Sequence, residues 1–249
     1  MRDRIIYIET STSLTSVALS EDGRIIARKD TEVPRSQASL TAPFIDEMLR
    51  ELGLRVKDCD AVCVSKGPGS YTGLRVGSST AKGLCFGAGI PLIAVGTLET
   101  LVAQAQDDGL VPEGCRYIVP MIDARRMEVY TAVFSASGQR LTETAPVIVD
   151  GSTFADRLAE GPVLFIGDGA LKCREVILGT AVANESQALL RAPDGNRDGA
   201  LFIGCCPRAD AMLRPAMAAL KEERFEDTAY FEPFYLKQFV ATVSAKKLF

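Results

Sequence analysis

Short apolar runs alternate with turn-forming residues over the first thirty positions of the chain. The runs are long enough for strands, and the polar stretches between them are too short to hold a helical connection. The pattern therefore predicts an antiparallel set of three strands, at residues 4–10, 14–20 and 24–30.

After this set the hydrophobic period changes to that of a helix. Leu40, Phe44, Met48 and Leu52 recur every four residues and are followed by Gly53, which predicts a helix that ends at the glycine. Strand and helix patterns then alternate as a strand at 60–65, a helix to about residue 86, a strand at 91–96 and a helix at 97–106. This order joins an antiparallel edge to parallel crossovers and predicts a ribonuclease-H-like lobe.

The same pattern begins again after a turn-rich break at residues 107–114. Strand patterns follow at 117–124, 127–136, 139–149 and 162–167, with a helix near 152–159. In both halves the first strand ends in an acid, Glu9 or Asp123, before a polar turn, a second strand and a glycine turn. This weak repeat predicts an α/β fold of two tandem ribonuclease-H-like lobes, the architecture of the actin, Hsp70 and sugar-kinase superfamily.

The last third of the chain is less regular. Residues 207–224 have helical character, with a kink expected at Pro215, whereas residues 180–205 predict no definite structure. The end of the chain mixes aromatic residues with lysines, which favours a packed segment. The expected domains are a first lobe at 1–108, a second, smaller lobe at 109–225 and a tail at 226–249 that packs back on the lobes.

Composition narrows the possible functions. The 249 residues include 28 Lys and Arg against 32 Asp and Glu, giving a formal net charge of −4, and histidine is absent. A protein that binds nucleic acid alone usually carries a basic excess, so we do not expect independent RNA binding. Without histidine the chain cannot form a Ser-His-Asp triad, a Cys-His dyad or an imidazole zinc site.

Nothing in the pattern predicts a targeting or membrane segment. The apolar run in MRDRIIYIET is too short for a signal-peptide core, and the most apolar later stretch, 84–96, is interrupted by Gly87, Gly89 and Pro91. The seven cysteines include no CxxC pair, which is typical of buried, reduced thiols. We therefore expect a cytoplasmic protein without membrane contact.

The strand at 60–65 runs into a glycine-rich turn, SKGPGSYTGLRVG (65–77). Neither GxGxxG nor GxxxxGK[ST], the phosphate-binding patterns, fits it. Gly73, Gly77 and Ala81 recur every four residues along one helix face, although each interior glycine costs roughly 1 kcal/mol relative to alanine. Close approach of another backbone, from a neighbouring strand or a partner's helix, would offset this cost. The alternative is that the free amides of the turn hold an anion.

These residues resemble the TsaB family, also known as YeaZ. The resemblance is carried by VSKGPGSYTGLRVGSSTAKGLCFGAGIPLIAVGTLETL (64–101) and, more weakly, by ETSTSLTSVAL near the N-terminus, DARRMEVY (123–130) and GDGA (167–170). It implies a protein needed, together with the TsaC, TsaD and TsaE types, to make threonylcarbamoyladenosine on tRNA. Two departures from the family pattern are Glu9, in place of an aspartate, and Gln37, where many relatives have histidine.

The same block also resembles TsaD, the catalytic paralogue, whose His-Leu-Glu-Gly-His type motif binds the catalytic metal. This chain has Thr97-Leu98-Glu99-Thr100-Leu101 at that place. A threonine hydroxyl is a weak ligand and leucine is none. The comparison implies no metal site, no cofactor and no catalytic residues, and therefore no enzyme activity of the chain by itself.

The resemblance implies a non-catalytic scaffold that binds a TsaD-type subunit, together with a TsaE-type ATPase, and reaches tRNA only through that complex. The first lobe would supply the contact, through Leu40, Phe44, Met48, Gly73, Arg75, Gly77, Ser79, Lys82 and Phe86. Packing in the core of the lobe is the alternative for Phe44, Met48 and Leu52. The same surface could also form a homodimer.

A second hypothesis is an ATP-dependent phosphotransferase that acts in the cleft between the lobes. GDGA resembles the adenosine-binding turn of the superfamily, and Asp123 would be the acid. Arg125 and Arg126, in the turn after Asp123, would pair with phosphate or form surface ion pairs. The candidates for a nucleotide or anion site are Glu9, Gly67, Gly69, Ser70, Asp123, Gly167 and Gly169.

Overall fold

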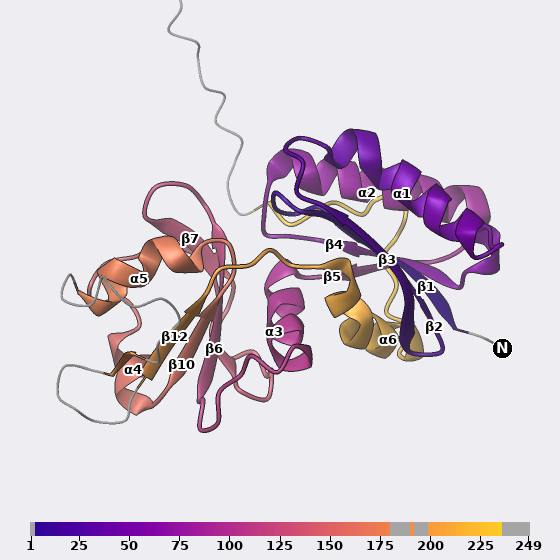
Figure 1. Cartoon of the computed structure of the whole chain (residues 1–249). Helices are drawn as coiled ribbons and strands as arrows, with labels where there is room; N and C mark the ends of the chain where they lie inside the picture. The colour runs from indigo at the N-terminus through magenta and orange to yellow at the C-terminus, as the bar shows by residue number, and fades with distance from the viewer. Residues whose placement is uncertain (1–2, 180–189, 192–198, 236–249) are drawn as a thin grey trace, which may run out of the picture.

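The computed structural model describes residues 3–179, 190–191 and 199–235 of the chain. Two β-sheets lie in separate halves of the molecule, with helices packed on their faces (Figure 1). None of the helices in the described part is both long and apolar enough to cross a membrane.

The first sheet has the order β3-β2-β1-β4-β5. Its strands are β1 (Arg4–Glu9), β2 (Thr15–Glu21), β3 (Arg24–Thr31), β4 (Ala61–Ser65) and β5 (Leu92–Val95). The first three are antiparallel neighbours, whereas β1, β4 and β5 are parallel. Every residue of β4 is buried because helices cover both faces of the sheet, which explains its uninterrupted apolar sequence.

Helices α1 (Gln37–Glu51) and α2 (Tyr71–Ala88) lie side by side on one face of this sheet (Figure 1). A short 3-10 helix, η1 (Val56–Asp58), leads from α1 toward β4. Ser70 caps the start of α2, since its side chain accepts a hydrogen bond from the Gly73 N–H, and Gly89 ends the helix in the left-handed conformation.

The second sheet repeats the first. Its strands are β6 (Tyr117–Asp123), β7 (Glu128–Thr131), β8 (Phe134–Ser135), β9 (Ala145–Ile148), β10 (Val163–Ile166), β11 (Leu190–Arg191) and β12 (Gly199–Ile203). Reading β9-β7-β6-β10-β12 gives the strand order of the first sheet, with β11 added at the edge and β8 beside β6. Helices α4 (Ala155–Glu160) and α5 (Ala170–Leu178) take the places of α1 and α2 in the chain order. The predicted α/β fold of two tandem ribonuclease-H-like lobes is confirmed.

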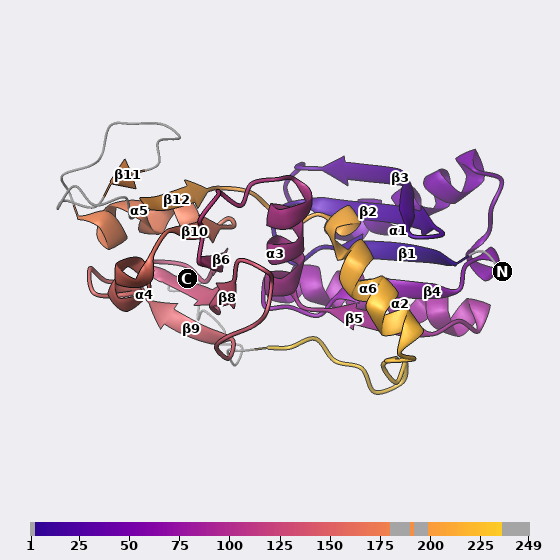
Figure 2. The ribbon, with the colours of Figure 1, turned by 90° about the horizontal axis from the view of Figure 1, so that it is seen from below.

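Two helices are exchanged between the halves. Helix α3 (Thr97–Asp107) follows β5 of the first sheet, but its Leu98 and Leu101 pack in one core cluster with Ile118 and Leu164 of the second sheet. In the other direction, η3 (Ala209–Met212) and α6 (Leu213–Lys221) follow β12 and pack on the first sheet (Figure 2). The division at residue 108 stays a prediction. The core cluster on each sheet contains residues from both sides of this position.

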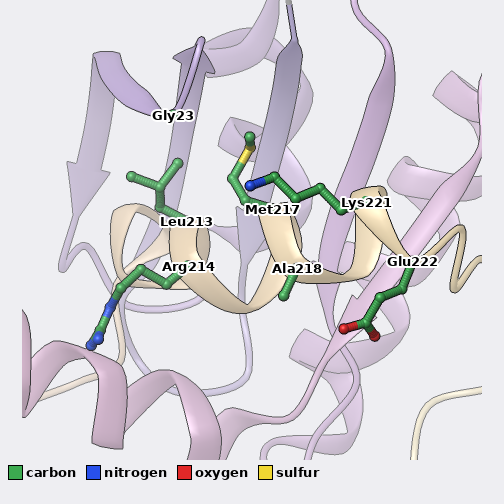
Figure 3. A pocket seen from close by; sticks show the side chains of 7 residues that line it. All are labelled: Gly23, Leu213, Arg214, Met217, Ala218, Lys221 and Glu222. Atoms are coloured by element: carbon green, nitrogen blue, oxygen red, sulfur yellow. The ribbon is translucent and has the colours of Figure 1, made fainter.

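The helical character expected over 207–224 is found at residues 209–221, but the kink expected at Pro215 is wrong. The chain forms η3 and then α6, and Pro215 lies in the first turn of α6. Backbone nitrogens in a first turn have no helical acceptor, so proline removes no hydrogen bond there. Side chains along α6 border a groove, which Figure 3 shows with Leu213, Met217 and Lys221 beside Gly23 of the β2–β3 turn.

Candidate functional site

The glycines predicted to meet a partner lie instead on the inner face of α2. A Cβ on Gly73 would overlap the carbonyl oxygen of Thr10, and a Cβ on Gly77 would lie 2.5 Å from the Thr10 hydroxyl and 3.4 Å from Val64. Both glycines are buried. They let α2 approach β1 and β4 of its own lobe, so the assignment of Gly73 and Gly77 to a partner surface is corrected.

Helix α1 divides its apolar residues between the core and its exposed side. Met48 is fully buried in the cluster that also holds Ile6, Val62 and Leu92, so its assignment to a partner contact is also wrong. Phe44 is half-buried and packs against the same cluster, and Leu40 is half-buried as well. The four-residue spacing does not separate them, because a helix turns 400° in four residues and the face drifts along the sheet.

The solvent-facing side of α2 carries two glycines with free space above them and one exposed aromatic ring. Phe86 is 88% exposed, and a Cβ on Gly83 or on Gly87 would meet nothing within 4 Å. Arg75 and Ser79 are exposed on the same helix. We define Arg75, Ser79, Gly83, Phe86 and Gly87 as the outer face of α2. Sequence reasoning named three of its members and missed Gly83 and Gly87, whose spacing of four was the available signal.

Lys82 has a partner within the chain. Its ammonium group donates hydrogen bonds to the carbonyl oxygens of Ala229 (3.0 Å) and Phe231 (3.1 Å). Lys82 therefore fixes the beginning of the tail against α2, whereas we expected it from the sequence to contact a partner protein. Residues 226–235 pack along the first lobe, and Phe231 is 8% exposed within its core; the rest of the predicted tail lies outside the described residues.

Glu9 is sealed inside the first lobe. Its side chain is 0% exposed, and Oε1 accepts a hydrogen bond from the Ser11 N–H at 2.6 Å. Its other oxygen, Oε2, is buried and has no hydrogen-bond partner among the described residues. Burial raises the pKa of Glu9 to about 7, and the hydrogen bonds from Ser11 oppose that rise.

The glycine-rich turn packs against the loop that follows Glu9. The Ser70 N–H donates to the Ser11 carbonyl at 2.6 Å, and a Cβ on Gly69 would overlap that same carbonyl. Gly67 lies against Leu74 and the backbone of Phe234. The turn that was a candidate anion cradle is thus occupied by contacts with the β1–β2 loop and the tail.

Asp123, the matching acid of the second lobe, has a different environment. Its side chain is 45% exposed and forms an ion pair with Lys172, whose ammonium also donates to the carbonyls of Arg126 (2.8 Å) and Glu128 (2.7 Å). The Arg125 N–H donates to the same carboxylate. Lys172 lies 49 residues from Asp123 in the chain, and no local pattern pointed to it.

The GDGA turn packs against the end of β6. A Cβ on Gly167 would overlap the Met121 carbonyl, and one on Gly169 would lie 2.9 Å from Val129. The Asp168 carboxylate accepts a hydrogen bond from the Asp123 N–H at 2.8 Å. Gly167 and Gly169 therefore serve close packing within the second lobe.

The positions that match the metal motif of TsaD are used in packing. Thr97 is buried and its hydroxyl lies 2.9 Å from that of Ser65, while Leu101 is fully buried in the core beneath the second sheet. Glu99 forms an ion pair with Arg140. Among the described residues no cluster of three or more Cys, Asp and Glu side chains could hold a metal ion.

Taken together, the fold and these contacts define a class of protein: two ribonuclease-H-like lobes whose candidate nucleotide residues are engaged within the chain, and whose first lobe presents a helical face. The family model described as "TsaD: tRNA N6-adenosine threonylcarbamoyltransferase" matches residues 31–245. The chain belongs to the TsaB (YeaZ) family within this group, and the resemblance seen in residues 64–101 is confirmed.

Individual relatives agree with this assignment. The tRNA threonylcarbamoyladenosine biosynthesis protein TsaB of Escherichia coli is 29% identical over 242 residues, which cover 96% of each chain. That of Bacillus subtilis is 33% identical over 169 residues, covering 66% of this chain and 70% of the relative. A crystal structure from Pseudomonas aeruginosa, described as similar to peptidase YEAZ, superposes with a TM-score of 0.76 at 24% identity and covers 94% of this chain and 100% of that one.

Proposed function

We propose that this chain is the TsaB-type subunit of threonylcarbamoyladenosine biosynthesis, and that it binds a TsaD-type catalytic subunit without itself being an enzyme. The family membership and the names of its relatives support the pathway. The complex acts in the cytoplasm, includes a TsaE-type ATPase and brings the chain to tRNA. The net charge of −4 is consistent with a tRNA contact that the other subunits provide.

The outer face of α2 is the proposed docking surface. The observation that carries this proposal is Phe86, whose ring is 88% exposed beside two glycines with open space above them. An exposed aromatic side chain next to small residues allows a partner helix to approach closely while it buries the ring. The exposed edge of α1 with Phe44 continues this surface, since α1 and α2 lie side by side.

The test measures binding of the purified chain to a TsaD-type subunit by calorimetry. We expect Phe86→Ala to weaken binding at least about tenfold, as for a central aromatic contact. Gly83→Leu, which fills the open space, should have a similar effect. Ile148→Ala is the matched control, because Ile148 is 75% exposed on β9 of the second lobe; it should bind as the unaltered chain does.

Equal binding by all of these variants would refute the docking surface. The pathway is tested by reconstituting the complete system with and without this chain and measuring modified tRNA. A stable complex that does not increase the yield of modified tRNA would refute the proposed pathway. The chain alone could also form a homodimer. If Phe86→Ala abolishes that homodimer, a second copy of this chain and the TsaD-type subunit compete for the same face of α2.

A further inference from the structure

A second surface lies along the described part of the tail, beside the N-terminal part of α2, where Tyr235 packs on Tyr71. Residues 226–235 border a groove of about 620 Å³ beside the loop that follows β4. Three of its four aromatic side chains are exposed, Tyr230 at 84%, Phe234 at 48% and Tyr235 at 37%, whereas Phe231 is 8% exposed. Figure 2 shows this segment running past β5, at the edge of the first sheet.

The backbone of the groove is anchored at several points. The Glu226 N–H donates to the Leu92 carbonyl at 2.8 Å, and the Phe234 N–H donates to the Lys66 carbonyl at 2.7 Å. Between these bonds, Lys82 holds two carbonyl oxygens and the ring of Phe231 is buried in the core. A ligand that binds here therefore meets a formed surface and does not have to order it.

Acidic side chains dominate the charge of the groove. Glu226, Asp227 and Glu232 line it, against one cationic residue, Lys66. Within the described part of the chain none of the three carboxylates forms an ion pair, although Asp227 accepts the Ala229 N–H at 2.8 Å. Phosphate groups would be repelled from such a surface, whereas cationic side chains would be attracted.

The aromatic side chains next to the groove already contact a guanidinium group. Arg75 lies over the ring of Tyr71 at 4.8 Å, and the rings of Tyr71 and Tyr235 are 5.0 Å apart. Tyr230, at 84% exposure, presents a similar ring that no guanidinium of the described residues covers. The quadrupole of a tyrosine ring attracts cations to its face, and arginine makes this contact more often than lysine does.

We propose that this groove binds an extended segment of another protein that carries arginine side chains, with one guanidinium on the ring of Tyr230 and others facing Glu226 and Glu232. This inference does not depend on the proposed function, because its test needs neither a TsaD-type subunit nor tRNA. The partner is defined by its chemistry, a cationic peptide without regular structure.

The test uses a fluorescein-labelled peptide of four Gly-Arg repeats and measures its anisotropy with the full chain. We expect binding that weakens several-fold as salt is added, because exposed charges are screened. Tyr230→Ala should weaken it about two- to fivefold, the range for one exposed cation–π contact, while Tyr230→Phe keeps the ring and should preserve it. Glu232→Gln should weaken it about threefold, within the range of one exposed ion pair.

Two controls separate the groove from general charge attraction. Glu143→Gln removes an exposed acid of the second lobe and should leave binding unchanged, and a peptide of four Gly-Glu repeats should not bind. The proposal is overturned if Tyr230→Ala and Glu232→Gln bind the Arg peptide as well as Glu143→Gln does. It is also overturned if a single-stranded RNA oligonucleotide binds the chain and loses its binding in Tyr230→Ala, since the groove would then be a nucleic-acid site.

Discussion

Helix α2 carries two pairs of glycines that do opposite things. Gly73 and Gly77 are buried, and a side chain at either would meet Thr10 of the neighbouring strand and loop, whereas Gly83 and Gly87 have open space above them. Both pairs have the same spacing of four in one helix. The pair at the start of the helix allows close packing within the lobe, whereas the pair at its end leaves free space on the surface. A glycine repeat therefore indicates that a close approach is possible, but it does not say whether another segment occupies the space.

The largest effect should come from the inner pair. Gly73→Ala would place a methyl group onto the Thr10 carbonyl, which belongs to the backbone and cannot move aside easily. We expect a loss of about 3 kcal/mol in the free energy of unfolding, at the upper end for an overpacked site. Urea denaturation of the two proteins measures it.

A loss below about 1 kcal/mol, the ordinary size for a point mutation, would contradict the close contact between α2 and the β1–β2 loop. The same contact makes Gly77→Leu unsuitable for testing partner binding, because a bulky side chain 2.5 Å from Thr10 would disrupt the lobe first.

The next effect concerns Glu9, the fully buried acid at the end of β1. Burial raises the pKa of Glu9 from an ordinary 4.5 to about 7, so the folded state favours the protonated form. The stability that Glu9 contributes is complete below pH 4.5 and is lost as the pH rises toward 7. Glu9→Gln, which cannot ionise, should therefore be more stable than the unaltered chain at pH 8, by up to about 3 kcal/mol.

The measurement compares urea unfolding of both proteins at pH 4.5 and pH 8. The difference between them should grow over this interval, whereas Glu143→Gln, at an exposed position, should give a nearly constant difference. If the Glu9→Gln difference is also constant, the carboxylate is not buried in the way the structure describes.

The smallest effect concerns the outer pair. Gly83→Ala adds a methyl group into open space inside a helix, and we expect it to raise the free energy of unfolding by about 0.5–1 kcal/mol. Thermal unfolding detects such a gain as a higher melting temperature. A loss of stability would show that the outer face is already in contact within the chain, and the contrast between the two pairs would disappear.

Much of the fold followed from patterns along the chain. Turn residues separated β1, β2 and β3, and the repeat of Glu9 and Asp123 at strand ends predicted the second lobe. The exchange of α3 and α6 was not predictable, because an apolar helix face indicates burial without indicating which sheet covers it. Their true partners are set by contacts between segments far apart in the sequence.

The candidate site was predicted less well, for a related reason. Phe44 and Met48 share a helical spacing, yet one is half-buried and the other is fully buried beneath α1. Glu9 and Asp123 match in the repeat, but Glu9 is fully buried and Asp123 is exposed and paired with Lys172. Such differences depend on distant residues, which the pattern of a single segment does not contain.

The exchanged helices also bear on how the protein is made. The last strand of the first sheet, β5, ends at Val95, but α6, which covers one face of that sheet, ends only at Lys221. At usual translation speeds roughly 6–25 s separate the synthesis of these two points. During that interval Tyr7 and Cys63, which later contact the η3 and α6 segment, have no covering helix, so a nascent chain of this protein exposes a bare sheet face to chaperones until its synthesis is almost finished.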